Sequence, residues 1–267
     1  LPKTNEYQVL NDLITKSNLH TICTSGKCPN MGECWAAGTA TFMILGNICT
    51  RGCKFCNVTT GKPLAPDIEE PRKLAAAIKQ LGLKHAVITS VDRDDLSDGG
   101  ATHWAETIKE IRILNPSLTI ETLIPDFDAK PELLDIVADS KPDIISHNLE
   151  TVERLTPLVR TKAQYRTSLK VLEYLVNKGI TVKSGIMLGL GETTEEIYAT
   201  MDDLLAVGCR IMTIGQYLQP SAKNLNVERY VTPDEFETLK KAGIEKGFRF
   251  VESGPLVRSS YHAEKHI

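Results

Sequence analysis

The chain has 267 residues, of which 42% are hydrophobic and 24% are charged, and its formal net charge is −3. This composition is ordinary for a globular soluble protein, and the length accommodates one or two domains. The sequence has no long run of lysine or arginine that would indicate nucleic-acid binding. No apolar stretch reaches the roughly 18 residues of a membrane span. We therefore expect neither nucleic acid nor a membrane as a partner.

The first 38 residues precede the main repeating pattern of the chain. Leucines and other apolar residues in the first 20 positions have helical spacing, which predicts a short helix packed on the outside of the main body. Residues 23–34 contain Gly, Pro and Asn, and we expect an irregular loop there. Residues 39–45 are apolar and rich in β-branched side chains, which predicts a buried strand.

From residue 39 onward, strand patterns alternate with helix patterns. The predicted strands cover 39–45, 86–91, 118–124, 143–147, 180–188 and 210–216. The predicted helices cover 71–81, 104–114, 131–138, 169–179, 197–208 and 233–245. Strict alternation implies parallel strands with right-handed crossovers. Because a full barrel has eight units, these six predict an α/β fold, a partial (β/α)6 TIM-type barrel, with 248–252 as a possible extra piece.

No linker-like, repeated or low-complexity segment divides the sequence. We therefore expect a single domain spanning 1–267. In this interpretation 1–38 is an N-terminal extension that carries cysteines, 39–247 is the partial barrel, and 248–267 is a C-terminal extension.

Six of the seven cysteines lie between Cys23 and Cys56 and form two triplets. The first is Cys23, Cys28 and Cys34 (C-x4-C-x5-C), and the second is Cys49, Cys53 and Cys56 (C-x3-C-x2-C). The predicted strand between them would separate its ends by roughly 20 Å, so two separate sites are expected. The seventh, Cys209, stands apart beside an apolar run and is expected to be an inert buried thiol.

Three cysteines per site favour iron–sulfur chemistry over the alternatives. A closed structural zinc site takes four protein ligands, and neither spacing suggests the His or carboxylate that would complete one. A chain of this size does not need disulfides to stabilise it. Three thiolates on a four-iron cube leave one iron open to a substrate, a cofactor or an unusual protein ligand.

Polar segments follow most of the predicted strands. In parallel α/β proteins, ligands bind at the carboxyl ends of the strands. The segments with donors and acceptors suited to a zwitterion and a ribose contain Ser90, Asp92, Asn148 and Glu192. These four residues are our candidates for cofactor binding.

The second triplet, with Phe55 just before its last cysteine, resembles the cluster motif of the radical S-adenosylmethionine (SAM) superfamily. Further motifs along nearly the whole chain resemble those of the lipoyl synthases. These motifs are C-x4-C-x5-C, C-x3-C-x2-C, SVDRDDL, HNLETV, MLGLGE and the terminal RSSYHA. A lone CxxxCxxC would indicate only the superfamily, whereas the paired triplets together with RSSY are highly specific.

The resemblance implies insertion of two sulfur atoms at C6 and C8 of an octanoyl chain carried on a lysine. It implies two [4Fe–4S] clusters and SAM as cofactors. Cys49, Cys53 and Cys56 would hold the cluster that cleaves SAM. The auxiliary cluster, which is the sulfur donor, would be held by the first triplet and by Ser260. The catalytic residues implied are Cys49, Cys53, Cys56 and Ser260.

The resemblance also implies partners. They are an octanoylated lipoyl carrier protein (the glycine cleavage H protein or an E2 lipoyl domain), an electron donor such as ferredoxin or flavodoxin, and an iron–sulfur carrier for cluster repair. Clustered thiols indicate a reducing compartment. We expect the cytoplasm, or the mitochondrial matrix or plastid if a targeting segment precedes the sequence.

Two other functions are compatible with parts of the pattern. One is a radical SAM sulfur insertion enzyme that acts on a free small molecule, as biotin synthase does. The other is an iron–sulfur electron carrier without catalytic activity, which would need no SAM pocket and would not cleave SAM.

Overall fold

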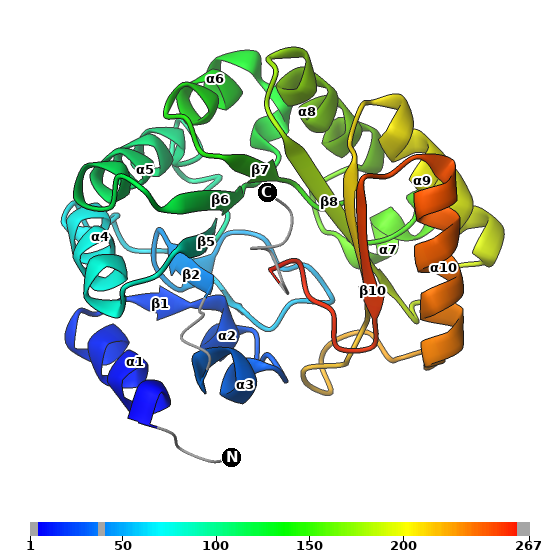
Figure 1. The fold of residues 1–267 in the computed structure, drawn as a ribbon, viewed down its shortest axis with the longest axis horizontal. Helices are drawn as coiled ribbons and strands as arrows, with labels where there is room; N and C mark the ends of the chain where they lie inside the picture. The colour runs from blue at the N-terminus through cyan, green and yellow to red at the C-terminus, as the bar shows by residue number, and fades with distance from the viewer. Residues whose placement is uncertain (1–4, 37–40, 261–267) are drawn as a thin grey trace. The chain divides into compact units, whose positions relative to one another are not determined.

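The computed structural model describes residues 5–36 and 41–260 (Figure 1). The chain forms two compact units. The first comprises Leu1–Arg51, Asn57–Phe127 and Glu132–Asp143, and the second comprises Gly52–Cys56, Asp128–Pro131 and Ile144–Ile267. Each unit contains parallel strands accompanied by helices.

The first unit is built on a mostly parallel set of strands. In spatial order they are β1 (His20–Thr21), β2 (Thr41–Ile44), β5 (His85–Ser90) and β6 (Thr119–Leu123). The pairs β2–β5 and β5–β6 are parallel, whereas β1 is antiparallel to β2. All residues of β2 and the centre of β5 are buried. Burial on both faces is typical of a parallel sheet.

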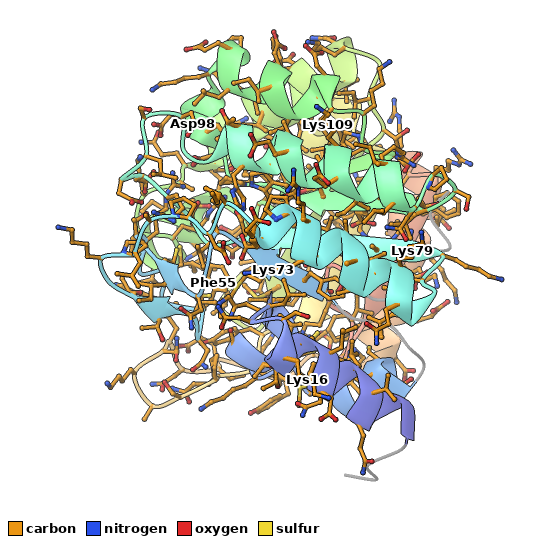
Figure 2. All side chains as sticks on the ribbon, turned by 90° about the vertical axis from the view of Figure 1, so that its left-hand side faces the viewer. Lys16, Phe55, Lys73, Lys79, Asp98 and Lys109 are labelled. Carbon is orange, nitrogen blue, oxygen red and sulfur yellow. The ribbon has the colours of Figure 1, made fainter. Side chains whose placement is uncertain are left out.

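One helix of this unit precedes its strands, and three more follow β2, β5 and β6. They are α1 (Asn5–Lys16), α4 (Glu70–Leu81), α5 (Ala101–Leu114) and α6 (Pro131–Asp139). Figure 2 faces α1, α4 and α5, with the exposed Lys16, Lys79 and Lys109 on them. The opposite side of α5 buries Trp104 and Ile108 completely. Helices with one exposed polar face and one buried apolar face are what the apolar periodicity of the sequence predicts.

The cysteine-bearing segments contain short elements. These are α2 (Ile22–Ser25), α3 (Met31–Ala36), β3 (Ile48–Cys49) and β4 (Thr59–Thr60). The prediction of an irregular loop over 23–34 is therefore wrong. Helix α2 begins after Thr21, whose hydroxyl accepts a hydrogen bond from the Thr24 N–H at 3.2 Å. Helices of one or two turns are too short to produce a recognisable apolar period.

The second unit contains β7 (Ile144–Ser146), β8 (Val182–Leu188), β9 (Ile211–Gln216) and β10 (Phe250–Gly254) in that spatial order. The pairs β7–β8, β8–β9 and β9–β10 are parallel. The predicted extra piece at 248–252 overlaps β10, which begins two residues later and pairs with β9 from Phe250 to Gly254.

The helices of the second unit are α7 (Thr156–Val159), α8 (Tyr165–Asn177), α9 (Thr194–Ala206) and α10 (Pro233–Lys246), with a 3-10 turn at Glu153–Leu155. Capping boxes begin α9 and α10. In α9, for example, the Thr193 hydroxyl accepts from the Glu196 N–H, while the Glu196 carboxylate accepts from the Thr193 N–H. These reciprocal bonds satisfy donors that have no partner within the helix.

A left-handed turn follows β6. Phe127, Asp128 and Ala129 have φ angles of 45°, 52° and 53°. A non-glycine residue in this region costs roughly 1–2 kcal/mol. Among the described residues, no helix is both long and apolar enough to cross a membrane.

Candidate metal and cofactor site

The first cysteine triplet lies on α2, on α3 and between them. The Cys28 N–H donates to the Cys23 carbonyl at 3.0 Å, which closes the loop between these two residues. Burial first, and then the neighbouring Cys23 and Cys28, raises the pKa of Cys34 to about 11. Burial also raises the pKa of Cys23, and Cys28 adds to this increase. The three thiols therefore lie close enough to interact electrostatically.

The raised pKa of Cys34 should be visible in the reactivity of its thiol. In the cluster-free folded chain, iodoacetamide labelling of Cys34 should accelerate about tenfold per pH unit up to about pH 10, because only the thiolate reacts. In denaturant the rate should level off near the ordinary thiol pKa of about 8.5. Mass spectrometry of the labelled peptide measures both curves. Levelling near pH 8.5 in the folded chain would contradict the expected burial of this thiol.

The second triplet begins at the end of β3. The buried Cys49 sulfur accepts hydrogen bonds from the N–H of Arg51 at 3.4 Å and of Asp92 at 3.3 Å. Its thiol donates to Asp92 Oδ2 at 3.6 Å. The sulfur is thus oriented by backbone groups on two different segments of the first unit.

Cys53 and Cys56 belong to the second unit. The Cys53 sulfur lies 3.9 Å from the Thr161 hydroxyl, and the Cys56 N–H donates to the Cys53 carbonyl at 3.0 Å. The Asn224 side-chain amide donates to the Cys56 carbonyl at 2.9 Å. Both cysteines are partly exposed, which leaves their sulfurs accessible to a ligand.

The donor set suits iron–sulfur clusters. All seven cysteines are free thiols, so none is used in a disulfide. Within residues 5–36 and 41–260, no three His, Cys, Asp or Glu side chains gather closely enough to hold one metal ion. A four-iron cube binds each thiolate through a different iron. The three thiolates of one cube therefore stand farther apart than the ligands of a single metal ion. Three cysteines that are too widely spaced for one ion can still hold one cube.

Two of the predicted cofactor-binding residues carry buried polar atoms without a partner. They are Ser90, at the end of β5 in the first unit, and Asn148, after β7 in the second. The Ser90 hydroxyl and the Asn148 Oδ1 make no hydrogen bond within the described chain. Asn148 is only 7% exposed, and its amide donates to the Ser259 hydroxyl at 3.3 Å. Buried polar atoms usually have partners, so these two are suited to a polar ligand.

The other two predicted residues are engaged with the protein itself. Asp92 lies beside Cys49, and burial raises the pKa of its carboxyl group more than Arg51 lowers it. The Glu192 oxygens accept from the N–H groups of Gly189 at 2.6 Å and Leu190 at 2.9 Å. Glu192 therefore shapes the loop after β8, and its direct contact with a cofactor stays a prediction.

Ser260 is the last described residue and is half-buried. Tyr261, His262 and Ala263, which complete the terminal motif RSSYHA, lie outside the described residues.

Comparison with known proteins identifies the family. The sequence profile of the radical SAM superfamily matches residues 43–204. A lipoyl synthase of Phocaeicola vulgatus is 62% identical over 261 residues, covering 98% of this chain and 92% of that protein. One from Treponema denticola is 58% identical over 267 residues, covering 100% and 92%.

The chain belongs to the lipoyl synthase family.

Membership confirms the main predictions from the sequence. A lipoyl synthase is an enzyme, a radical SAM sulfurtransferase, and its cofactors are SAM and [4Fe–4S] clusters. The class of substrate is the lipoyl carrier protein.

Solved structures agree on the fold. HydG, a maturase of the [FeFe]-hydrogenase, superposes with a TM-score of 0.62 at 15% identity, covering 90% of this chain and 61% of that chain. Methylornithine synthase (PylB) gives a TM-score of 0.54 at 12% identity, covering 91% and 81%. These likenesses confirm the predicted α/β class, a partial TIM-type barrel.

Two charged residues at the segment that carries the second triplet (residues 49–56, the cysteine loop) were not among the predicted site residues. Arg51 lies inside the second triplet, and Asp126 follows the predicted strand 118–124. Both are buried and pair with each other at 3.0 Å. Their positions, one within a cluster motif and one at a strand exit, were signals that could have identified them.

Proposed function

We propose that this chain inserts two sulfur atoms, at C6 and C8, into an octanoyl chain that an amide links to a lysine of a lipoyl carrier protein. The observation that carries the proposal is the pair of cysteine triplets in a chain so similar to lipoyl synthases. One cluster suffices for cleaving SAM. A second, separate triplet supports a second cluster that supplies sulfur.

In this proposal Cys49, Cys53 and Cys56 hold the cluster that cleaves SAM. When bound, reduced cluster and SAM together supply a carbon radical able to break an unactivated C–H bond. The protein contributes position and exclusion of water. Asn148 Oδ1 and the Ser90 hydroxyl, both buried without partners, are suited to accept hydrogen bonds from the ammonium or ribose hydroxyls of SAM.

The second cluster is assigned to Cys23, Cys28, Cys34 and Ser260. A serine oxygen is a harder ligand than a thiolate and a poorer match for iron–sulfur chemistry. Ser260 would therefore be released readily when the cluster gives up sulfur. Unchanged turnover after Ser260→Cys would argue against this role.

The finer identity of the partners is also proposed here. The carrier is the glycine cleavage H protein or an E2 lipoyl domain, the electron donor is ferredoxin or flavodoxin, and an iron–sulfur carrier repairs the second cluster. Seven free thiols indicate a reducing compartment. Together with the bacterial relatives, they support the cytoplasm as the location.

Turnover with an octanoyl-lysine peptide tests the function. We expect the anaerobically reconstituted chain, given dithionite and SAM, to form 5′-deoxyadenosine and a dithiolated peptide, both measured by mass spectrometry. An enzyme acting on a free small molecule would cleave SAM but leave the octanoyl peptide unchanged. An electron carrier would not cleave SAM at all. Either result would refute the proposal.

A further inference from the structure

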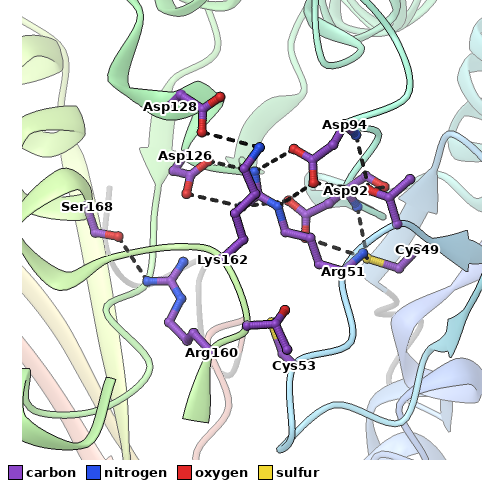
Figure 3. A network of polar contacts seen from close by, with 12 residues as sticks. Cys49, Arg51, Cys53, Asp92, Asp94, Asp126, Asp128, Arg160, Lys162 and Ser168 are labelled. Atoms are coloured by element: carbon purple, nitrogen blue, oxygen red, sulfur yellow. Dashed lines mark hydrogen bonds and ion pairs between the residues drawn. The ribbon is translucent and has the colours of Figure 1, made fainter. Parts of the chain in front are cut away.

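Arg51 is a charged residue buried inside the cysteine loop, only 8% exposed. Its guanidinium binds Asp94 through Nε and Nη2, both at 2.8 Å. It binds Asp126 through Nη1 at 3.1 Å and Nη2 at 3.0 Å, and Asp92 lies 3.5 Å from Nη1. Figure 3 shows Arg51 among these three carboxylates. Paired bonds of this kind are strong and geometrically specific.

The carboxylates come from two strand exits of the first unit. Asp92 and Asp94 follow β5, and Asp126 follows β6. Arg51 follows β3, so one side chain links three segments. Thr50 strengthens the same link, because its N–H and its hydroxyl both donate to the Asp92 carbonyl, at 3.1 Å and 3.0 Å. Two of the three linked segments, those that follow β3 and β5, carry the two N–H donors to the Cys49 sulfur.

We propose that Arg51 is a positioning residue: by binding Asp92, Asp94 and Asp126, it fixes the two backbone N–H groups that donate to the Cys49 sulfur and thereby sets the reduction potential of the cluster. The inference rests on the proposed role of Cys49 as a cluster ligand. Hydrogen bonds to cluster sulfurs stabilise the reduced cluster, which carries the greater negative charge, and so raise its reduction potential. Loss of these bonds therefore makes the potential more negative.

The chemistry of arginine explains why this residue type is required. A guanidinium offers five N–H donors in a planar fork, whereas an ammonium offers three donors at one point. Lysine at position 51 would keep the charge but could not form paired bonds with two carboxylates. Arg51→Lys therefore separates geometry from charge.

The chain offers a matched control in Arg93. This residue is 2% exposed and binds Asp95 through Nε at 2.9 Å and Nη2 at 2.8 Å. It also follows β5, but its guanidinium otherwise donates to the carbonyls of Leu45 and Leu64 rather than to residues that bind Cys49. Arg93→Lys therefore makes the same chemical change in a comparable buried pair.

The first measurement uses the cluster-free chain. Hydrogen–deuterium exchange resolved to the amides of Arg51 and Asp92 should be faster by about tenfold or more in Arg51→Lys. In Arg93→Lys these two amides should exchange as in the wild type. Wild-type protection in Arg51→Lys, or equal acceleration in both variants, would overturn the inference.

The second measurement uses the reconstituted holoprotein. Redox titration followed by electron paramagnetic resonance should give a more negative potential in Arg51→Lys, and an unchanged one in Arg93→Lys. If Arg51→Lys does not fold, Asp94→Glu, which keeps both charges but displaces the carboxylate from its paired position, should shift the potential in the same direction. An unshifted potential would overturn the inference. Failure of the proposed function is distinguishable, since it would appear as a wild-type chain that does not cleave SAM.

Discussion

Replacing Cys23, Cys28 and Cys34 together with alanine is expected to lower the iron content from about eight to about four per chain, since each cube holds four irons. SAM cleavage should persist, because Cys49, Cys53 and Cys56 remain. Sulfur insertion into the octanoyl peptide should fall below detection. Iron and sulfide analysis after anaerobic reconstitution, together with the peptide assay, measures all three results.

Cys209→Ala is the matched control for this experiment. Cys209 is fully buried and lies far from both cysteine triplets in the sequence. Burial raises its pKa to about 12. A protonated, inaccessible thiol binds no iron, so this variant should keep about eight irons. About four irons in both the wild type and the triple variant would show that the first triplet is not a cluster site.

Glu70→Ala should lower the free energy of unfolding by roughly 2–6 kcal/mol, because two buried groups lose their partner at about 1–3 kcal/mol each. The Glu70 carboxylate accepts from the Leu45 N–H at 2.7 Å and lies 2.8 Å from His103 Nε2. Leu45 itself has a φ of 67°, so Glu70 secures a strained exit from β2. The chain passes through this exit on its way to Cys49. Urea unfolding of the cluster-free chain measures the loss.

Two variants define what the Glu70 result means. Glu69→Ala removes a neighbouring carboxylate that is 52% exposed and lies 4.0 Å from Arg72. It should change stability by less than about 0.5 kcal/mol. Glu70→Gln keeps an acceptor for Leu45 and should lose less than Glu70→Ala. Equal losses in Glu69→Ala and Glu70→Ala would mean that removing a carboxylate from the start of α4, not loss of the buried bonds, causes the effect.

The regular part of the fold was predictable because its signals are local. The apolar run before Ser90 gives β5, and Gly82, with φ 62°, ends α4 where the sequence places a helix stop. Both cysteine triplets are also local patterns. Short elements such as α2 were missed, since their bonds involve single side chains such as Thr21 rather than a repeated apolar period.

The polar network at the cysteine loop could not be predicted in detail. Arg51 reaches Asp94 across 43 residues of sequence and Asp126 across 75. Which carboxylates pair depends on the register between strands, and a sequence alone does not give that register. Glu192 illustrates the same difficulty, because its residue type suits a ligand contact, whereas its oxygens bind the N–H groups of its own loop.

The left-handed turn at Phe127, Asp128 and Ala129 restricts how this segment can diverge during evolution. Glycine and asparagine enter such a backbone conformation readily, whereas valine and isoleucine do not, because their branched β-carbon clashes with the chain. The turn starts directly after Asp126, so a substitution that forces the chain out of it would redirect that carboxylate. The residue types allowed at Phe127, Asp128 and Ala129 are therefore limited by the need to keep Asp126 bound to Arg51, although none of the three residues is a cysteine.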